Sequence, residues 1–494
     1  MLLYPKALGK FERPISSKKP EAQAYFNQGF QLMYAFDQNG AVRSFRESEK
    51  RDPECAICYW AEAWSWGSYL NGPMPPQNAP FAYAAIQKAV ALAPDHATEV
   101  ERDFISAMTV RYVKDFEPAK RREYDAAYAE AARKLYQKYP KDADAGTLYG
   151  EALFVMEPRR GARDIKAPNV RRIIDVFETV LKLDSMHVGA CHLYIHITEA
   201  TSQPGLAEAC ADTIINAVPG ASHLNHMPSH TWNQLGRWGD SVLANVQAVE
   251  SDRLAETGEG FAIYPSHNQH MLLFAASFDG EGAIAMEAAR GYEKLTRDKM
   301  YTVLTLIRFG RFDEVLKLTG RPEEDIEAGV WDFGQGYARL RRGEIDAARE
   351  QLQRVQKGAE TSKTSFRVYT ARNLLGTLAG ILEGEIERSQ GDLPKAIAAF
   401  ERGIVAQDAT AYDEPEALPF DVRQWLGAAL LEAKRYPDAE RVYREELKKH
   451  PHNGWSLIGL KDALKAQGKA VAEVEQDFAE SWARSDTPIR ASRF

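Results

Sequence analysis

The sequence predicts an all-α fold, an α-solenoid of about nine to ten helix–turn–helix repeats. Two observations support this prediction. Alternation of apolar and polar residues, which would indicate strands, is scarce, whereas Ala, Leu, Glu and Arg recur at helical spacing. A set of small, large and helix-ending residues also returns in the same order along the chain, as in proteins built from stacked repeats.

The first repeat covers residues 22–53. Gly29, Ala41, Phe45 and Pro53 are spaced so that small residues mark a close helix crossing, Phe fills the seam and Pro ends the second helix. This spacing resembles the tetratricopeptide repeat (TPR), a 34-residue helix–turn–helix unit. The resemblance implies a stack of helical hairpins, and it leaves the activity open because a fold does not determine a function.

The TPR-like register continues along nearly the whole chain. Gly236-Arg237-Trp238 and Gly310-Arg311-Phe312 match the turn between the two helices of a repeat. The register predicts an N-terminal extension, N-terminal TPR-like repeats, central repeats with a histidine-rich groove, and C-terminal TPR-like repeats, at residues 1–21, 22–140, 141–295 and 296–494.

A narrower resemblance involves the segments PECAICYWAEAW, HMPSHTWNQLGRWGD and YPSHNQH. They resemble a poorly characterised group of bacterial TPR proteins that is usually described only by its repeats. Members of that group often carry export signals. The resemblance therefore bears on localisation and implies no particular activity.

Composition and charge narrow the possible partners and compartments. The net charge of −8 argues against nucleic acid, and no apolar run is long enough to predict a membrane span. The N-terminus lacks the pattern of a signal peptide, which predicts a cytoplasmic protein, or a periplasmic one if an export signal was removed. Cys55 and Cys58 predict a packed pair, because no second Cys pair completes a zinc motif.

Eight of the eleven histidines lie between His187 and His270. Imidazole is the commonest protein ligand for transition metals, and side chains three or four residues apart share a helix face. Six of these histidines form such pairs: His192 with His196, His226 with His230, and His267 with His270. The spacing predicts a metal site with these six side chains as ligands.

The repeat register predicts that these histidines face the concave groove. Glu199 and Glu151 fall at groove positions too, and we expect them to act as ligands, as a general base or as partners that orient an imidazole. His223, Tyr264 and Trp232 are expected to contact a substrate. Pro228 predicts that the helix carrying His226 and His230 is kinked or begins only near Met227.

Two classes of function remain open. In the first, the groove is the site of a metal-dependent enzyme, redox or hydrolytic, that acts on a small molecule or peptide. Copper is the favoured metal, and iron or zinc is possible. The site would hold either one or two metal ions. In the second, a TPR scaffold binds a protein or peptide, and the groove is metal-free or its metal is structural or adventitious. A zincin protease is not expected, because neither HxxxH pair has the glutamate of HExxH.

Overall fold

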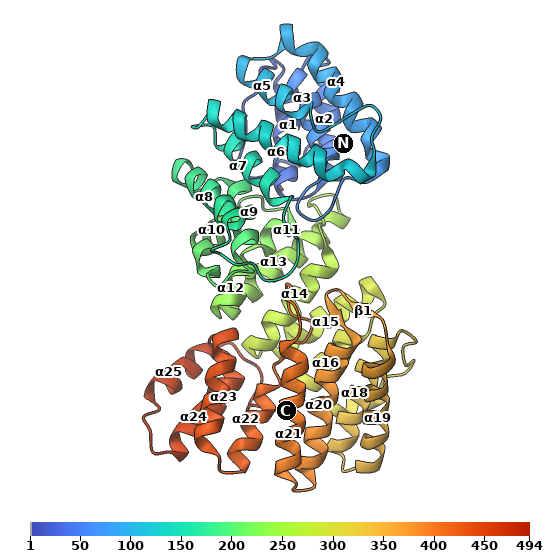
Figure 1. Ribbon diagram of the computed structural model, residues 1–494, viewed down its shortest axis with the longest axis vertical. Coiled ribbons are helices and arrows are strands. Elements are labelled where there is room, and N and C mark those ends of the chain that lie inside the picture. Colours follow the sequence, from blue (N-terminus) through green and yellow to red (C-terminus); the bar gives the residue numbers. More distant parts are fainter. Residues whose placement is uncertain (1) are drawn as a thin grey trace. The chain divides into compact units, whose positions relative to one another are not determined.

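The structure is a computed structural model that describes residues 2–494, and it is helical almost throughout (Figure 1). It comprises two compact units. The first contains the chain up to Thr231 together with Gln247–Tyr264, and the second contains Trp232–Val246 together with Pro265–Phe494. The histidine-rich stretch that the sequence places in one central segment therefore contributes residues to both units.

The first unit consists of consecutive helical hairpins. Its α-helices are α1 (Pro20–Tyr34), α2 (Gln38–Arg51), α3 (Ala56–Trp66), α4 (Ala79–His96), α5 (Glu99–Met108), α6 (Arg121–Lys138), α7 (Ala143–Phe154), α8 (Pro168–Leu183), α9 (Val188–Thr198), α10 (Glu208–Ile214) and α11 (Ser222–His226). Three short 3-10 helices lie in its connections: η1 (Pro76–Asn78), η2 (Pro118–Lys120) and η3 (Pro204–Ala207). The boundary between the units passes through α12 (Pro228–Leu235) and α13 (Trp238–Glu256).

The second unit continues the pattern. Its helices are α14 (Pro265–Asp279), α15 (Gly282–Thr296), α16 (Met300–Arg308), α17 (Phe312–Lys317), α18 (Asp325–Arg341), α19 (Ile345–Thr361), α20 (Ala371–Ser389), α21 (Leu393–Asp408), α22 (Arg423–Glu432), α23 (Tyr436–Lys449), α24 (Gly454–Ala466) and α25 (Ala472–Ser481). A small antiparallel hairpin, β1 (Ser365–Phe366) with β2 (Tyr369–Thr370), joins α19 to α20.

The helices cross where the repeat spacing places its small residues. A Cβ atom on Gly29 in α1 would lie 2.6 Å from the ring of Phe45 in α2, and one on Gly384 in α20 would lie 2.3 Å from the ring of Phe400 in α21. Glycine therefore lets the large ring fill each seam, as the sequence predicts. The all-α, TPR-like fold predicted from the sequence is confirmed.

The segment before α1 is tied to the first unit by polar contacts. The side chain of Gln31 in α1 accepts a hydrogen bond from the backbone N–H of Gly9 at 2.8 Å. Arg13 pairs with Asp142 at 2.9 Å and with Asp144 at 2.5 Å, at the start of α7. These contacts connect residues that the sequence predicts only as an extension to α1, which follows them directly, and to α7, which lies far along the chain.

All four cysteines are paired in disulfides, Cys55 with Cys58 and Cys191 with Cys210. The sequence predicts Cys55 and Cys58 as a packed pair and leaves their disulfide state open, and the structure pairs them in a disulfide. One turn at the start of α3 brings their Cα atoms to 5.4 Å, within the range that a disulfide spans. The second bridge joins α9 to α10.

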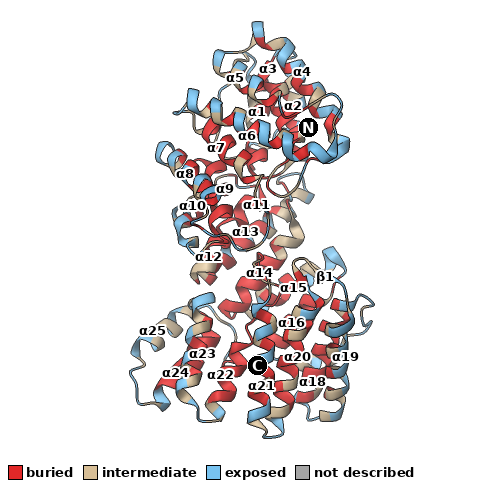
Figure 2. Ribbon diagram, in the orientation of Figure 1, coloured by how far each residue is buried: buried red, intermediate tan, exposed pale blue. Residues whose placement is uncertain are grey.

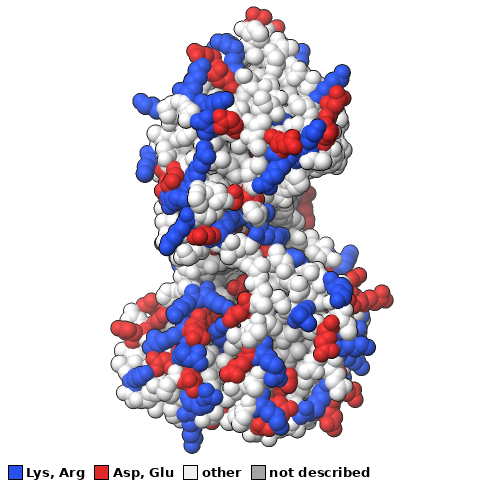
Figure 3. Space-filling model, viewed as in Figure 1, with Lys and Arg blue, Asp and Glu red and all other residues white. Residues whose placement is uncertain are grey.

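The surface is mixed in charge. On the face shown in Figure 3, Lys and Arg are interspersed with Asp and Glu over both units. The expectation that the chain does not bind nucleic acid stays a prediction. None of the helices formed by the described residues combines the length and apolar character that a membrane span requires.

Candidate metal centre

The histidines of the first unit lie in its interior. Every residue of α9 is buried, and the helices around it are buried on their inner faces (Figure 2). His192 is 0%, His196 1% and His226 0% exposed. The prediction that these side chains face an open groove is therefore wrong. The reason is that aromatic rings from outside the repeat register, chiefly those of Phe36 and Tyr264, pack against the imidazoles.

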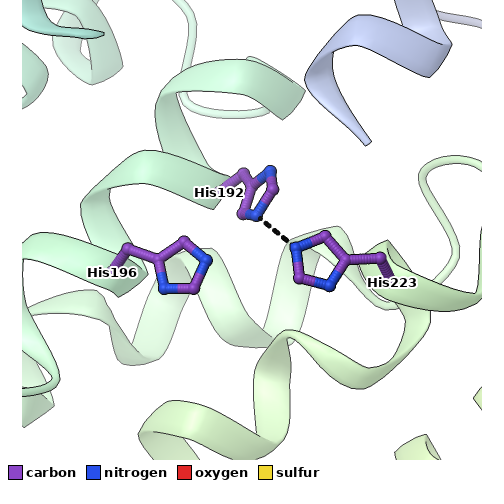
Figure 4. A group of neighbouring side chains, drawn as sticks. All are labelled: His192, His196 and His223. Atoms are coloured by element: carbon purple, nitrogen blue, oxygen red, sulfur yellow. Dashed lines mark hydrogen bonds between the residues drawn. The ribbon is translucent and has the colours of Figure 1, made fainter. Parts of the chain in front are cut away.

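Three imidazoles from two helices face one another (Figure 4). His192 and His196 are one turn apart on α9, and His223 comes from α11. Each offers one ring nitrogen to a group whose atoms all lie within 4.8 Å of one another. The sequence predicts His192 and His196 as metal ligands, whereas it places His223 among the residues expected to contact a substrate.

Hydrogen bonds determine which ring nitrogens of His192 and His223 face one another. Nδ1 of His192 donates to the carbonyl oxygen of Tyr34 at 2.6 Å, which leaves a lone pair on Nε2. Nε2 of His192 lies 3.1 Å from Nε2 of His223. That separation is close to the roughly 3.3 Å edge of a nitrogen tetrahedron around a metal ion with bonds of about 2.0–2.1 Å.

His223 and His226 extend the group along α11. Nδ1 of His223 lies 2.9 Å from Nε2 of His226, so one of these nitrogens donates to the other. Burial lowers the pKa of His223, and neighbouring imidazoles lower it further, to well below its usual range. Burial and neighbouring imidazoles also lower the pKa values of His192 and His226 to well below their usual range. The imidazoles are therefore neutral at physiological pH, as metal binding requires.

Glu199, at the end of α9, connects the two helices that carry histidines. One carboxylate oxygen accepts from Nδ1 of His196 at 2.9 Å, and the other accepts from Nδ1 of His230 in α12. Burial alone would raise the pKa of Glu199, but the two imidazoles hold it well below its usual range. The carboxylate thereby fixes one tautomer in both rings, with Nε2 as the atom available to a metal.

His196 supplies the clearest sign of a missing partner. Its Nε2 atom is buried and has no hydrogen-bond partner within the described residues, and burial lowers the pKa of His196 to about 3. A buried nitrogen lone pair without a partner loses roughly 1–3 kcal/mol of free energy. Nitrogens of His196 and His230 and an oxygen of Glu199 also form a second group within 4.8 Å. We call His192, His196, Glu199, His223, His226 and His230 the histidine cluster.

The helix break at Pro228 has the predicted form. Helix α11 ends at His226, and α12 begins at Pro228. The imidazoles of His226 and His230 remain neighbours, with ring centroids 4.9 Å apart. The hydroxyl of Ser229 donates to the carbonyl oxygen of His226 at 2.6 Å, at the point where proline cannot supply a backbone N–H.

Phe36 is the site residue that the repeat pattern does not reveal. Its ring centroid lies 4.2 Å from that of His192, 5.3 Å from that of His223 and 5.9 Å from that of His196. Its φ of 63° is a left-handed conformation that is costly for a bulky side chain. The only signal in the sequence is an aromatic residue beside a turn, which is too common to identify a site.

Tyr264 lies beside the histidine cluster, and its expected contact with a substrate stays a prediction. Its ring packs edge-to-face on His223 at 5.1 Å between centroids. Its hydroxyl lies 2.8 Å from that of Tyr69, and Asn71 donates to it at 3.3 Å. Tyr264 also adopts a left-handed conformation, with φ of 56°, directly before α14. Tyr69 is a further residue that sequence reasoning missed.

Glu151 lies in α7 in a different setting. Its carboxylate accepts from Nε1 of Trp64 at 3.3 Å, and burial raises its pKa to about 7 against the opposing charge of Arg111. It belongs to none of the close ligand groups found among the described residues. A catalytic role for Glu151 stays a prediction from the sequence.

The remaining predicted site residues belong to the second unit. His270, on α14, packs on Tyr301 at 4.2 Å between ring centroids, and Arg367 lies 3.2 Å from its Nδ1 atom. Burial lowers the pKa of His270 to well below its usual range. His267 lies on the same helix and is partly exposed. Trp232 is buried, and the guanidinium of Arg237 lies 4.8 Å from its ring centroid.

Comparisons with known proteins assign the chain to no family. No protein-family model and no curated protein matches the chain. Among solved structures, the TPR domain of P58(IPK) shares 11% identity at a TM-score of 0.24, covering 90% of this chain and 98% of that one. A human IFIT1 dimer with m7Gppp-AAAA shares 10% identity at a TM-score of 0.31, and the match covers 96% of this chain and 92% of that one. Naa15/Naa10 bound to HypK-THB shares 13% identity at a TM-score of 0.24, and the match covers 94% of this chain and 70% of that one. At these TM-scores, the TPR-like assignment rests on the helical hairpins themselves.

Proposed function

We propose that the histidine cluster holds a transition metal and that the protein is a metal-dependent enzyme. The observation that carries the proposal is the carboxylate of Glu199, which accepts from Nδ1 of both His196 and His230. Carboxylate–histidine pairs of this kind orient imidazoles at metal sites. The partnerless Nε2 of His196 supports the same conclusion.

The residues present fit a metal that prefers nitrogen ligands. Nε2 atoms of His192, His196 and His223 would hold one ion, and His230 with Glu199 offers a second position beside it. Copper is the favoured metal, and iron or zinc fits the same donors. His226 supports His223 through a ring-to-ring hydrogen bond, and His267 and His270 remain candidates from the sequence.

A bound ion would supply either Lewis-acid or one-electron chemistry. The chain's own residues exclude water from the cluster and keep the imidazoles of His192, His223 and His226 neutral. The Tyr34 carbonyl and the Glu199 carboxylate fix the tautomers of the rings that donate to them. A structural metal is needed mainly where the apolar core is small. The first unit has a large apolar core that buries aromatic residues such as Trp60 and Trp64, which favours a catalytic role over a structural one.

The two disulfides support an oxidising compartment. Disulfides persist in secreted and periplasmic proteins and are rare in the cytosol. Among the alternatives that the sequence leaves open, we therefore favour the periplasmic one. The alternative of a non-catalytic TPR scaffold for a protein or peptide is tested by the same experiments as the metal site.

Elemental analysis of tag-free protein prepared without chelator tests the proposal. We expect about one or two equivalents of copper, iron or zinc per chain, present as purified or after reconstitution. His196→Gln and His223→Gln should remove most of it, whereas His96→Gln and His452→Gln, at the surface of the first and second units, should not. Metal content far below one equivalent in every preparation would contradict the proposal.

A second measurement separates an enzyme from a scaffold with a structural metal. Azide added to the copper-loaded protein should change its absorption and paramagnetic resonance spectra, because a catalytic site keeps an open coordination position. An unchanged spectrum, together with a large loss of thermal stability on metal removal, would indicate a closed structural site.

A further inference from the structure

Residues 485–494 contain no helix or strand and run against the helices of the second unit, where Figure 1 marks the end of the chain. We call this stretch the 485–494 segment. Residues 486–494 form no backbone–backbone hydrogen bond with any described residue. The segment is therefore attached mainly through contacts that involve side chains, as a bound peptide is.

The start of the segment is anchored at the N-terminus of α15. The carboxylate of Asp486 accepts from the backbone N–H of Gly282 at 2.7 Å and from that of Ala283 at 2.9 Å. These N–H groups have no partner within the helix, so a carboxylate is favoured there. Residues 487–491, which follow, are all partly or fully exposed.

The last three residues of the segment form a second anchor, which begins at the buried Ser492. Its hydroxyl donates to the carbonyl oxygen of Gln424 at 2.7 Å and lies 2.7 Å from the hydroxyl of Tyr443. One small side chain is therefore held by α22 and α23 together.

Arg493 forms the charged part of this anchor. It pairs with Glu432 at 3.1 Å and with Glu385 at 3.6 Å. Both carboxylates also pair with Arg388, and Glu385 lies 4.0 Å from Arg341. Arg493 therefore joins a network of alternating charges between α20 and α22.

Phe494 forms the apolar part of the anchor. Its ring is buried among aromatic side chains, with centroid distances of 4.7 Å to Trp425, 5.7 Å to Phe420 and 5.9 Å to Trp455. Its carbonyl oxygen accepts from the hydroxyl of Tyr337. Edge-to-face packing of this kind favours an aromatic ring over an aliphatic side chain at this position.

The surface under Phe494 keeps donors that the segment does not use. The guanidinium of Arg308 lies 4.2 Å from the ring centroid of Trp455 and 5.4 Å from that of Phe494. Its Nε atom and the Nε2 atom of Gln424 are buried without a hydrogen-bond partner among the described residues. An unpaired buried donor is costly, so an occupant with acceptor oxygens there would bind more tightly than the chain's own segment.

We infer that the surface under the 485–494 segment is a docking site for a partner protein, and that the segment occupies this site until the partner displaces it. The partner presents an extended stretch in which an aromatic residue follows an arginine, as in Arg493 and Phe494. The tether keeps the chain's own segment at a high local concentration. The partner must therefore supply contacts that the segment lacks, such as acceptor oxygens for Arg308 and Gln424.

Fluorescence anisotropy of a labelled peptide with the sequence SDTPIRASRF, that of residues 485–494, tests the inference on the full chain. Phe494→Ala should bind the peptide at least about tenfold more tightly than the wild type, in which the tethered segment competes. A peptide with alanine in place of its phenylalanine should bind at least about tenfold more weakly. Added to Phe494→Ala, Tyr443→Phe should weaken peptide binding about 2- to 10-fold, because it removes the hydroxyl beside Ser492. Tyr436→Phe, on the same helix, is the matched control and should change nothing.

The inference would be overturned by a lack of saturable peptide binding to Phe494→Ala up to roughly 1 mM, or by equal binding of the peptide and its alanine variant. A wild-type dimer that Phe494→Ala dissociates would identify a second copy as the occupant and overturn the assignment to a partner. Arg493→Gln is a milder variant that should also raise the affinity for the peptide, because it weakens the chain's own segment. Circular dichroism verifies folding, and unfolding of both variants would show that the segment is a permanent part of the core. None of these measurements depends on a metal.

Discussion

At the scale of single residues, Glu199 holds the two histidine-bearing helices in register. Its two oxygens accept from imidazoles on α9 and α12, and its side chain is fully buried. Glu199→Gln keeps the shape but leaves one acceptor oxygen where two N–H groups need one each. We expect metal affinity to fall about 10- to 100-fold in a competition titration with a chelator.

The control for that substitution is Glu178→Gln. Glu178 lies on α8 and accepts from the hydroxyl of Tyr194 on α9, so this substitution removes a carboxylate that contacts α9 without touching the imidazoles. Equal metal affinity in Glu199→Gln and the wild type would show that Glu199 does not orient ligands.

The raised pKa of His450 in the second unit predicts how the stability of the fold depends on pH. Burial would lower its pKa, but Glu416 at 3.4 Å and Glu446 at 2.8 Å outweigh burial and raise it to about 10. In the unfolded chain the value is 6.5. Because the folded state binds the proton more tightly, this stabilisation is complete below pH 6.5 and is lost as pH rises through about 10.

Urea unfolding at several pH values between 7 and 10 measures this effect. Between pH 7 and 10, the free energy of unfolding of the wild type should fall by at least about 1 kcal/mol more than that of His450→Gln. The comparison uses a difference between two proteins, so other groups that titrate in the same range cancel. Parallel pH profiles for the two proteins would show that His450 is neutral in the folded state.

At the scale of elements, the approach of α1 to α9 positions the first ligand. A Cβ atom on Gly189 would lie 2.3 Å from the ring of Tyr34, whose carbonyl oxygen accepts from His192. Gly189→Ala should therefore displace α1 from α9, cost about 1–3 kcal/mol of unfolding free energy and lower metal content. Gly358→Ala in α19, whose nearest neighbour is the flexible end of Leu375 at 3.0 Å, is the matched control.

The expected result is a joint loss of stability and metal in Gly189→Ala, measured by thermal unfolding and elemental analysis. In the control, removing a helical glycine should change stability by less than about 1 kcal/mol in either direction. A Gly189→Ala protein that keeps its full metal content would mean that the Tyr34 carbonyl is not needed to orient His192.

At the scale of the whole molecule, the disulfides determine how the protein responds to its redox environment. Thiol titration of the unfolded, unreduced protein should detect none of the four cysteines, and four after reduction. Cys191 and Cys210 are 19 residues apart, so their bridge should contribute about 3 kcal/mol by restricting the unfolded chain. Cys210→Ser should therefore unfold at a clearly lower temperature. Free thiols in the native, air-oxidised protein would contradict both disulfides and the oxidising compartment.

The repeat architecture is the part that local sequence determines. Small residues such as Gly29 and Gly384, and partners such as Phe45 and Phe400, act between adjacent helices, so their spacing along the chain carries the packing rule. The break at Pro228 is equally local, because proline removes its own N–H. The clustering of histidines on α9, α11 and α12 follows from the same register.

The burial of the cluster was decided only by tertiary structure. Phe36 reaches the imidazoles from the turn after α1, and Tyr264 reaches them from the segment before α14, at sequence distances that no periodicity encodes. The pairing of Glu199 with His230 likewise joins side chains 31 residues apart. The sequence by itself therefore determined which helices form and which side chains share a face. Whether that face is an open groove or an enclosed centre depended on long-range packing, because burial is set by residues whose contacts leave no repeating pattern in the chain.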